Sequence, residues 1–234
     1  MTDPLTLKST IKVCMFDQYG TVVDMQSGLV EAATPFLKAR NWQGSPDSFV
    51  TWWRRTHFEN SMIDALLEKD HTPYREIGER AVAFVMDRAG IPHTSDDVRA
   101  LVAAIEHLKP FPEVPDALEK LRSRYKLAVL SNGDPDMLEA ARAHHGIEFD
   151  RIISVAVANA FKPHHRTYEM AAELMGVGRG EVLFIANHAF DCIGAKATGM
   201  RTAFIDRRRR PFGATPHQPD LIVPSMTELA ALIA

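Results

Sequence analysis

The segment IKVCMFDQYGTVVD, residues 11–24, decides the fold, because a nearly unbroken apolar run stops at one carboxylate and a turn. Such a run is typical of a strand that is buried on both faces of a parallel sheet. Asp17 ends this strand, and Gly20 follows in the turn. Since the carboxyl ends of strands line the ligand crevice of open α/β sheets, we expect Asp17 to face a ligand. Capping the following helix is the alternative role for Asp17.

Composition limits the protein class. The 234 residues, 46% of them hydrophobic, suffice for one large domain or for a core domain with a smaller insertion. A net charge of −3 gives no electrostatic reason to expect nucleic acid binding, and the basic run at residues 207–210 is short enough for a solvated loop. Two cysteines, Cys14 and Cys192, fit a reducing compartment. Without a signal segment or a membrane-spanning apolar run, we expect a cytoplasmic protein with no membrane partner.

The pattern after the first strand is helical up to about residue 108. Amphipathic segments at residues 49–67, 74–89 and 96–107 follow a first helix that begins near Ser27, and no strand pattern interrupts them. The segment KPFPEVP, residues 109–115, is the expected hinge back to the sheet. We therefore predict a helical cap domain at residues 27–108, inserted into an α/β core domain formed by residues 1–26 and 109–234.

Strands and helices alternate after the hinge. Strands are predicted at residues 126–130, 151–157, 182–186, 202–205 and 220–223, and helices at residues 116–124, 135–145, 166–175, 192–197 and 226–233. Strands separated by helices of this length pair in parallel through right-handed crossovers. The predicted fold class is α/β, with a doubly wound, Rossmann-like parallel sheet.

Polar residues cluster where these strands end. Ser131 and Asn132 follow one strand, Lys162 follows the loop of another, and a third strand leads into Asn187-His188 and Asp191. Each residue alone has a structural explanation, such as a helix cap or a solvated loop charge. Their convergence on the edge that carries Asp17 indicates a functional site.

The motifs FDQYGT, LSNG, FKP with RTY, and NHAFD with GAKATG resemble those of the haloacid dehalogenase (HAD) superfamily over nearly the whole chain, and within it those of the L-2-haloacid dehalogenases. The resemblance implies an aspartate nucleophile, a lysine, a last-loop carboxylate and an arginine from the cap stretch WWRRTHFEN. The implied catalytic residues are Asp17, Thr21, Lys162, Asn187, His188 and Asp191. The implied substrate-binding residues are Tyr19, Arg54, Phe58, Tyr74, Ser131, Asn132 and Tyr168.

Two departures argue against the phosphatases of this superfamily. Phosphatases carry a second aspartate two residues after the nucleophile, where this chain has Tyr19, and a carboxylate pair for Mg²⁺, whose first position is Asn187. A halide leaves without protonation, which suits the missing acid. We therefore expect no metal and no cofactor. A Mg²⁺-dependent phosphatase and a non-catalytic binding module on the same fold are the alternatives from other classes.

The expected reaction is hydrolysis of a short 2-haloacid through an ester on Asp17. Ser131 and nearby backbone N–H groups would hold the substrate carboxylate, and Arg54 with Asn132 would stabilise the halide. His188 stands where the family commonly has asparagine, so it either takes the proton from the hydrolytic water or only hydrogen-bonds its own loop. Fluoroacetate and strained-ring azetidine-2-carboxylate are alternative substrates. Family resemblance also predicts a homodimer.

Overall fold

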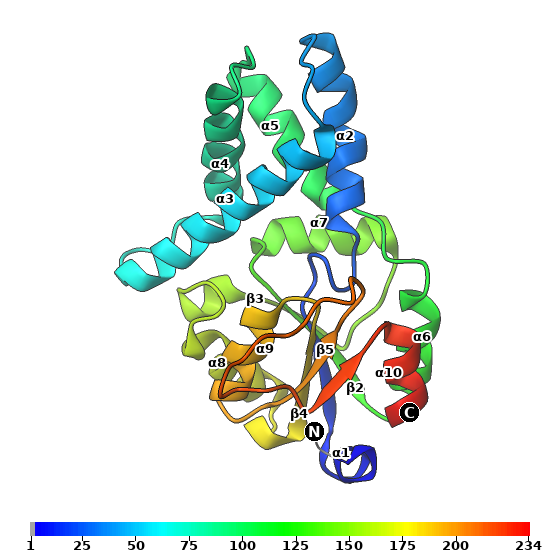
Figure 1. Ribbon diagram of the computed structural model, residues 1–234. Coiled ribbons are helices and arrows are strands. Elements are labelled where there is room, and N and C mark those ends of the chain that lie inside the picture. The colour runs from blue at the N-terminus through cyan, green and yellow to red at the C-terminus, as the bar shows by residue number, and fades with distance from the viewer. Residues whose placement is uncertain (1–2) are drawn as a thin grey trace.

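The computed structural model describes residues 3–234, and a six-stranded sheet in the order β3-β2-β1-β4-β5-β6 lies at its centre (Figure 1). All neighbouring strands pair in parallel. The strands are β1 (Val13–Phe16), β2 (Lys126–Ser131), β3 (Arg151–Ser154), β4 (Val182–Ala186), β5 (Arg201–Ile205) and β6 (Leu221–Val223). The central strand β1 is buried along its length, as its apolar run predicts. The predicted doubly wound α/β fold is confirmed.

Helices cover both faces of the sheet. α6 and α10 pack on one another, as do α8 and α9, and the two pairs lie on opposite sides of the sheet (Figure 1). The helices that flank the sheet are α1 (Pro4–Thr10), α6 (Val114–Arg122), α7 (Pro135–His145), α8 (His165–Met175), α9 (Ala189–Ala197) and α10 (Met226–Ile233). A short turn, η3 (Arg179–Glu181), precedes β4. Within residues 3–234 no helix is long and apolar enough to cross a membrane.

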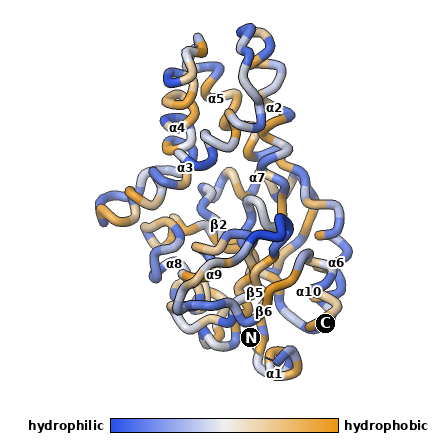
Figure 2. The backbone as a smooth tube through the Cα atoms, viewed as in Figure 1, coloured by the Kyte–Doolittle hydropathy of each residue, from blue (hydrophilic) through white to orange (hydrophobic). Residues whose placement is uncertain are grey.

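Four further helices stand together beyond the carboxyl edge of the sheet, and we call them the cap helices (Figure 1). They are α2 (Met25–Ala39), α3 (Pro46–Leu67), α4 (Tyr74–Arg88) and α5 (Ser95–Ala103), and the 3₁₀ turn η1 (Ala104–His107) follows them. Orange and blue alternate along their tubes in Figure 2, as expected for amphipathic helices that pack on one another. Their limits lie near the predicted boundaries at residues 27 and 108.

Three elements differ from the sequence-based expectations. The predicted helix 96–107 is α5 followed by η1, and α1 was not predicted. The predicted strand 151–157 ends at Ser154, where η2 (Val155–Ala158) begins. Ser154 Oγ accepts a hydrogen bond from Ala156 N at 3.2 Å and donates one to Gly133 O at 2.7 Å. This side chain starts the turn and ties it to the loop after β2, which overrides the strand preference of the following valines.

Candidate active site

Asp17 lies directly after β1, at the carboxyl edge of the sheet, and is 6% exposed. Its backbone N–H donates to Ile185 O at 3.0 Å, and its Oδ2 accepts a hydrogen bond from Thr21 Oγ1 at 2.7 Å. The alternative role as a helix cap is wrong, because Asp24 is the N-cap residue of α2. Gly20 has φ +91°, and a Cβ there would lie 2.9 Å from His188 Cε1. The turn after the nucleophile position therefore requires glycine.

Lys162 joins the two buried carboxylates of the site. Its Nζ donates to Asp17 Oδ1 at 2.8 Å, to Asp191 Oδ2 at 2.7 Å and to Leu130 O at 3.0 Å. These three acceptors use all the hydrogens of the ammonium group. The second oxygen of Asp191 accepts a hydrogen bond from Tyr168 OH at 2.6 Å. We call Asp17, Lys162, Asp191 and Tyr168 the buried cluster, and each is at most 6% exposed.

The electrostatics of the buried cluster keep Asp17 ionised. Burial alone would raise the pKa of Asp17, but the charge of Lys162 and the contact with His188 outweigh it and hold that pKa well below its usual range. For Lys162, burial acts to lower the pKa, and the two carboxylates reverse the effect and raise it. Burial raises the pKa of Asp191 despite the neighbouring ammonium. The first two shifts favour a carboxylate at Asp17 and an ammonium at Lys162.

His188 faces Asp17 from the loop between β4 and α9. Its Nδ1 lies 3.5 Å from Asp17 Oδ2, and its side chain is 30% exposed. Its backbone carbonyl accepts hydrogen bonds from Asp191 N and Cys192 N in the first turn of α9. The ring therefore has a fixed loop beneath it and one nitrogen near the nucleophile, as a base for water would require.

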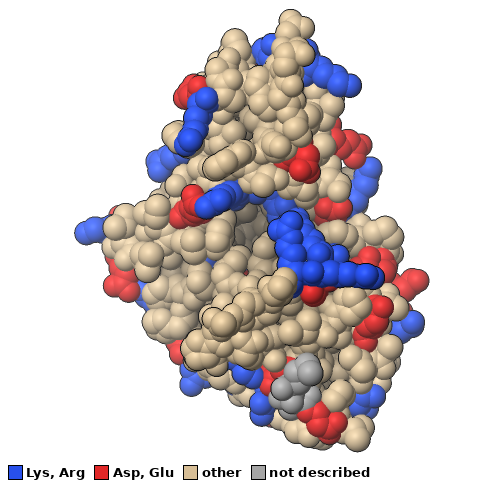
Figure 3. Space-filling model, in the orientation of Figure 1, with Lys and Arg blue, Asp and Glu red and all other residues tan. Residues whose placement is uncertain are grey.

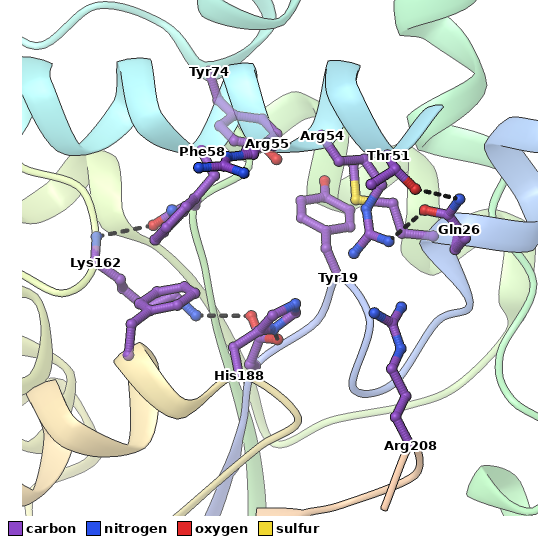
Figure 4. A pocket seen from close by; sticks show the side chains of 14 residues that line it. Tyr19, Gln26, Thr51, Arg54, Arg55, Phe58, Tyr74, Lys162, His188 and Arg208 are labelled. Atoms are coloured by element: carbon purple, nitrogen blue, oxygen red, sulfur yellow. Dashed lines mark hydrogen bonds and ion pairs between the residues drawn. The ribbon is translucent and has the colours of Figure 1, made fainter. Parts of the chain in front are cut away.

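A cavity of about 310 Å³ opens above Asp17, between the sheet edge and the cap helices (Figure 4). Apolar and aromatic contacts form part of its wall: the Phe58 and Phe190 rings lie 4.1 Å apart, and Tyr19 stacks on Tyr74 at 5.7 Å. Arg54 enters from α3, and its Nη1 donates to Gln26 Oε1 at 2.8 Å. The lining residues are Asp17, Tyr19, Met25, Gln26, Thr51, Arg54, Arg55, Phe58, Tyr74, Asn132, Lys162, His188, Phe190 and Arg208.

Some predicted site residues lie beneath this cavity instead of lining it. Ser131 is fully buried, and its Oγ accepts a hydrogen bond from Gly133 N at 3.2 Å. Tyr168 and Asp191 contact each other within the buried cluster. The Asn187 backbone N–H donates to Thr21 Oγ1 at 2.9 Å, and its side chain donates to Ile205 O. Neither Ser131 nor Tyr168 is among the residues that line the cavity, and their substrate-binding roles stay predictions.

Six lining residues were not among the predicted site residues: Met25, Gln26, Thr51, Arg55, Phe190 and Arg208. Phe190 lies inside the NHAFD motif, so its neighbours could have indicated it. Arg208 belongs to the basic run that was interpreted as a solvated loop. The remaining four depend on how α2 and α3 pack, which spacing along the chain does not reveal.

The donor set fits a divalent cation poorly. Mg²⁺ prefers several oxygen ligands, including carboxylates. Here the Lys162 ammonium occupies the position between Asp17 and Asp191, and Tyr168 takes the second Asp191 oxygen. Asn187 directs its amide at Ile205 O and away from the two carboxylates. No group of three or more His, Cys, Asp or Glu side chains within residues 3–234 is arranged to hold a metal ion.

Comparisons with known proteins agree with this geometry. A family model for haloacid dehalogenase-like hydrolases matches residues 11–199. The chain is 32% identical to an (S)-2-haloacid dehalogenase of Pseudomonas sp. strain YL, with 95% of this chain and 94% of that protein covered. It is 31% identical to haloacetate dehalogenase H-2 of Moraxella sp. strain B, with 96% and 98% covered.

Solved structures show the same relationship. The L-2-haloacid dehalogenase of Xanthobacter autotrophicus, solved with chloropropionic acid covalently bound, superimposes with a TM-score of 0.84 at 29% identity, covering 95% of this chain and 98% of that one. The chain therefore belongs to the haloacid dehalogenase-like hydrolases. The resemblance to the L-2-haloacid dehalogenases, inferred from the motifs, is confirmed.

Proposed function

We propose that this protein hydrolyses short 2-haloacids to 2-hydroxyacids and halide through an ester intermediate on Asp17. The observation that carries the proposal is the Asp17 carboxylate at the floor of a small cavity, held by Lys162 at 2.8 Å. The whole-length similarity to proteins named (S)-2-haloacid dehalogenase and haloacetate dehalogenase supports the substrate class.

In the first step the Asp17 carboxylate attacks the carbon that bears the halogen, and the carbon–halogen bond breaks as the new C–O bond forms. The halide leaves with the bonding electron pair, so no general acid is required. This suits Tyr19, whose buried hydroxyl is not acidic because burial raises its pKa. Arg54 and Asn132 line the cavity and supply N–H donors for the departing anion.

In the second step water attacks the ester carbonyl of Asp17, and the hydroxyacid leaves with the original carboxylate oxygen. His188 takes the proton of this water, a role supported by its position 3.5 Å from Asp17 Oδ2. Lys162 keeps Asp17 anionic before attack, and Asp191 with Tyr168 fixes Lys162. Thr21 holds the second oxygen of Asp17. Asn187 anchors Thr21 from below through its backbone N–H.

Halide release tests the function. The haloacids to test, with EDTA present, are chloroacetate, bromoacetate, fluoroacetate and each enantiomer of 2-chloropropionate. Azetidine-2-carboxylate contains no halogen, so its ring opening is followed by product analysis under the same conditions. We expect halide from at least one 2-haloacid. Turnover of p-nitrophenyl phosphate on adding Mg²⁺, with no haloacid or azetidine turnover, would favour a phosphatase.

His188→Gln separates the two chemical steps. If His188 activates water, ester hydrolysis slows more than halide release, and a halide burst equal to the enzyme concentration appears in rapid-quench experiments. His93→Gln, a change in the loop between α4 and α5 away from the cavity, is the control and should show no such burst. If halide release and ester hydrolysis slow equally in His188→Gln, His188 is not the base that activates water.

A homodimer and a cytoplasmic location complete the proposal. Large apolar side chains on α3 are exposed, including Trp52 at 54% and Leu66 at 79%, and such surfaces favour self-association. Two free, buried cysteines fit a reducing compartment. Light scattering coupled to gel filtration should give twice the mass of one chain, and the mass of one chain would refute the dimer.

A further inference from the structure

The basic run at residues 207–210 contains one side chain that reaches the cavity. Arg208 lines the cavity above Asp17, entering from the loop after β5, below Arg54 and across from Lys162 (Figure 4). Figure 3 shows Lys and Arg side chains gathered beside the hollow between the cap helices and the sheet. The loop therefore presents a cation to the site, beyond those the family resemblance assigned.

The loop that carries Arg208 is fixed by its neighbours. The Arg207 guanidinium donates to Thr21 O at 2.9 Å, forms an ion pair with Glu113 at 3.0 Å and lies 4.1 Å from the Phe111 ring centre. Asp206 Oδ1 accepts the backbone N–H of Arg210 at 2.8 Å. Arg207 thus ties the loop to the turn that contains the nucleophile, and this anchoring holds Arg208 near the cavity.

The charge in the cavity is unbalanced. Asp17 is its sole lining carboxylate, and Lys162 pairs with both Asp17 and the buried Asp191, so Lys162, Arg54 and Arg208 together exceed these two carboxylates by one positive charge. Arg55 pairs with Glu59 at 2.7 Å, whereas neither Arg54 nor Arg208 forms an ion pair with any residue in the described range 3–234. Asp24 lies in an adjoining hollow that Arg208 also borders, but its carboxylate caps α2 through Ser27 N at 3.1 Å. Two guanidinium groups at one cavity favour a bound anion.

We propose that Arg208 binds the carboxylate of the substrate, and that it is a specificity-determining residue which restricts the enzyme to anionic haloacids. The inference rests on the proposed function. Ser131, expected to hold this carboxylate together with nearby backbone N–H groups, is fully buried and does not line the cavity, so Arg208 supplies a positive charge that the backbone groups lack. A guanidinium offers two parallel N–H donors that match a carboxylate. Arg54 is then left for the halide side of the substrate.

Steady-state kinetics of Arg208→Ala test the proposal, with Arg210→Ala as the control. Arg210 has the same charge and the same loop but does not line the cavity. We expect KM for chloroacetate to rise about 10- to 100-fold in Arg208→Ala, the usual loss for a hydrogen-bonded charge pair, with a smaller change in kcat. Arg210→Ala should stay near wild type. Equal KM changes in both variants would show a diffuse charge effect and overturn the proposal.

Two further measurements separate this inference from the proposed function. The neutral analogue chloroacetamide lacks the carboxylate, so the wild type should turn it over far less efficiently than chloroacetate. Arg208→Ala should reduce the ratio of the two kcat/KM values, and an unchanged ratio would overturn the proposal. Binding of chloroacetate to Asp17→Asn can be measured by calorimetry, because this variant should not turn the substrate over. Adding Arg208→Ala to that variant should weaken binding about 10- to 100-fold. If the wild type turns over no haloacid but Arg208→Ala weakens binding, the proposed function is wrong and the anion site is supported. If chloroacetate does not bind Asp17→Asn, or binds equally well after Arg208→Ala is added, the anion site is refuted.

Discussion

The sheet edge and the cap-facing side of the cavity differ in how their charges are satisfied. In the buried cluster, Lys162 contacts two carboxylates within 2.8 Å, and both oxygens of Asp17 and of Asp191 have partners. Across the cavity, Arg54 is half-buried and, within residues 3–234, hydrogen-bonds only the neutral Gln26, and Arg208 is exposed at the rim. The first region is complete without a ligand, while the second presents donors that a ligand would satisfy.

This difference assigns the reaction and the choice of substrate to different parts of the fold. Groups that must hold one protonation state lie on a rigid sheet edge, where burial strengthens their mutual interactions. The groups that we propose contact the substrate come from α3 and the loop after β5, which can change without disturbing the strands. Substitutions in the two regions should therefore have different effects on turnover and on stability.

Asp17→Asn should have the largest effect on activity. An amide is a poor nucleophile, so we expect turnover to fall by about 10⁴-fold or more, as for other enzymes that lose a nucleophile. The fold should survive, because the amide still accepts from Lys162. Halide release and circular dichroism measure both outcomes. Substantial activity in a pure preparation, free of deamidated protein, would break the assignment of the chemistry to the sheet edge.

Lys162→Met should have the largest effect on stability. It leaves two buried carboxylates without their cation, which costs about 3–5 kcal/mol of unfolding free energy at neutral pH. The control is Lys196→Met, because Lys196 pairs with Asp220 at 2.6 Å but its side chain is 24% exposed. We expect a clearly smaller loss there. If urea unfolding shows equal losses of stability in the two variants, the buried cluster contributes no more to stability than a partly exposed ion pair.

The sheet edge was more predictable from sequence than the cap-facing side, for a physical reason. A strand that ends in a polar residue places that residue at the carboxyl edge whatever packs above it, which is why Asp17, directly after β1, and His188, two residues after β4, could be placed there. Lys162 lies beyond η2, and the FKP motif indicated it. The position of Ser131 at the end of β2 does not reveal that its hydroxyl lies beneath the cavity and accepts from Gly133 N. Arg208 was not predicted because its position at the cavity depends on a loop that Arg207 and Asp206 fix, and Arg207 contacts the distant residue Thr21.

His57 should make stability depend on pH through the cap helices. It is 1% exposed in α3, and burial lowers its pKa from 6.5 to about 4. Between pH 6.5 and pH 4, His57 is protonated in the unfolded chain but stays neutral in the folded protein. Lowering the pH across this window therefore reduces the free energy of unfolding by about 3 kcal/mol. His57→Gln should remove this part of the slope in unfolding free energy against pH. An unchanged slope would contradict a neutral, buried His57.

Substitution of Asp134 should have the smallest effect on stability. This residue, in the loop after β2, links the sheet edge to the cap helices through hydrogen bonds to the first turn of α4. Its carboxylate accepts Tyr74 N at 2.8 Å and Arg75 N at 2.9 Å, at the start of α4. Asp134→Ala should cost about 1–2 kcal/mol and raise KM, because Tyr74 lines the cavity. Thr94→Ala is the control: it removes the N-cap residue of α5, whose capping bonds lie entirely within the cap helices. This variant should be less stable but should have an unchanged KM. A KM increase in both variants would refute a specific link to Tyr74.

The most direct test of the central claim is a single turnover in H₂¹⁸O with enzyme in excess over substrate. If Asp17 forms the ester, the hydroxyl oxygen of the product comes from the enzyme and contains no ¹⁸O, while mass spectrometry of the peptide that contains Asp17 shows one ¹⁸O atom. A product labelled with ¹⁸O in the first turnover, together with an unlabelled Asp17 peptide, would mean that water attacks the substrate directly and would contradict the account.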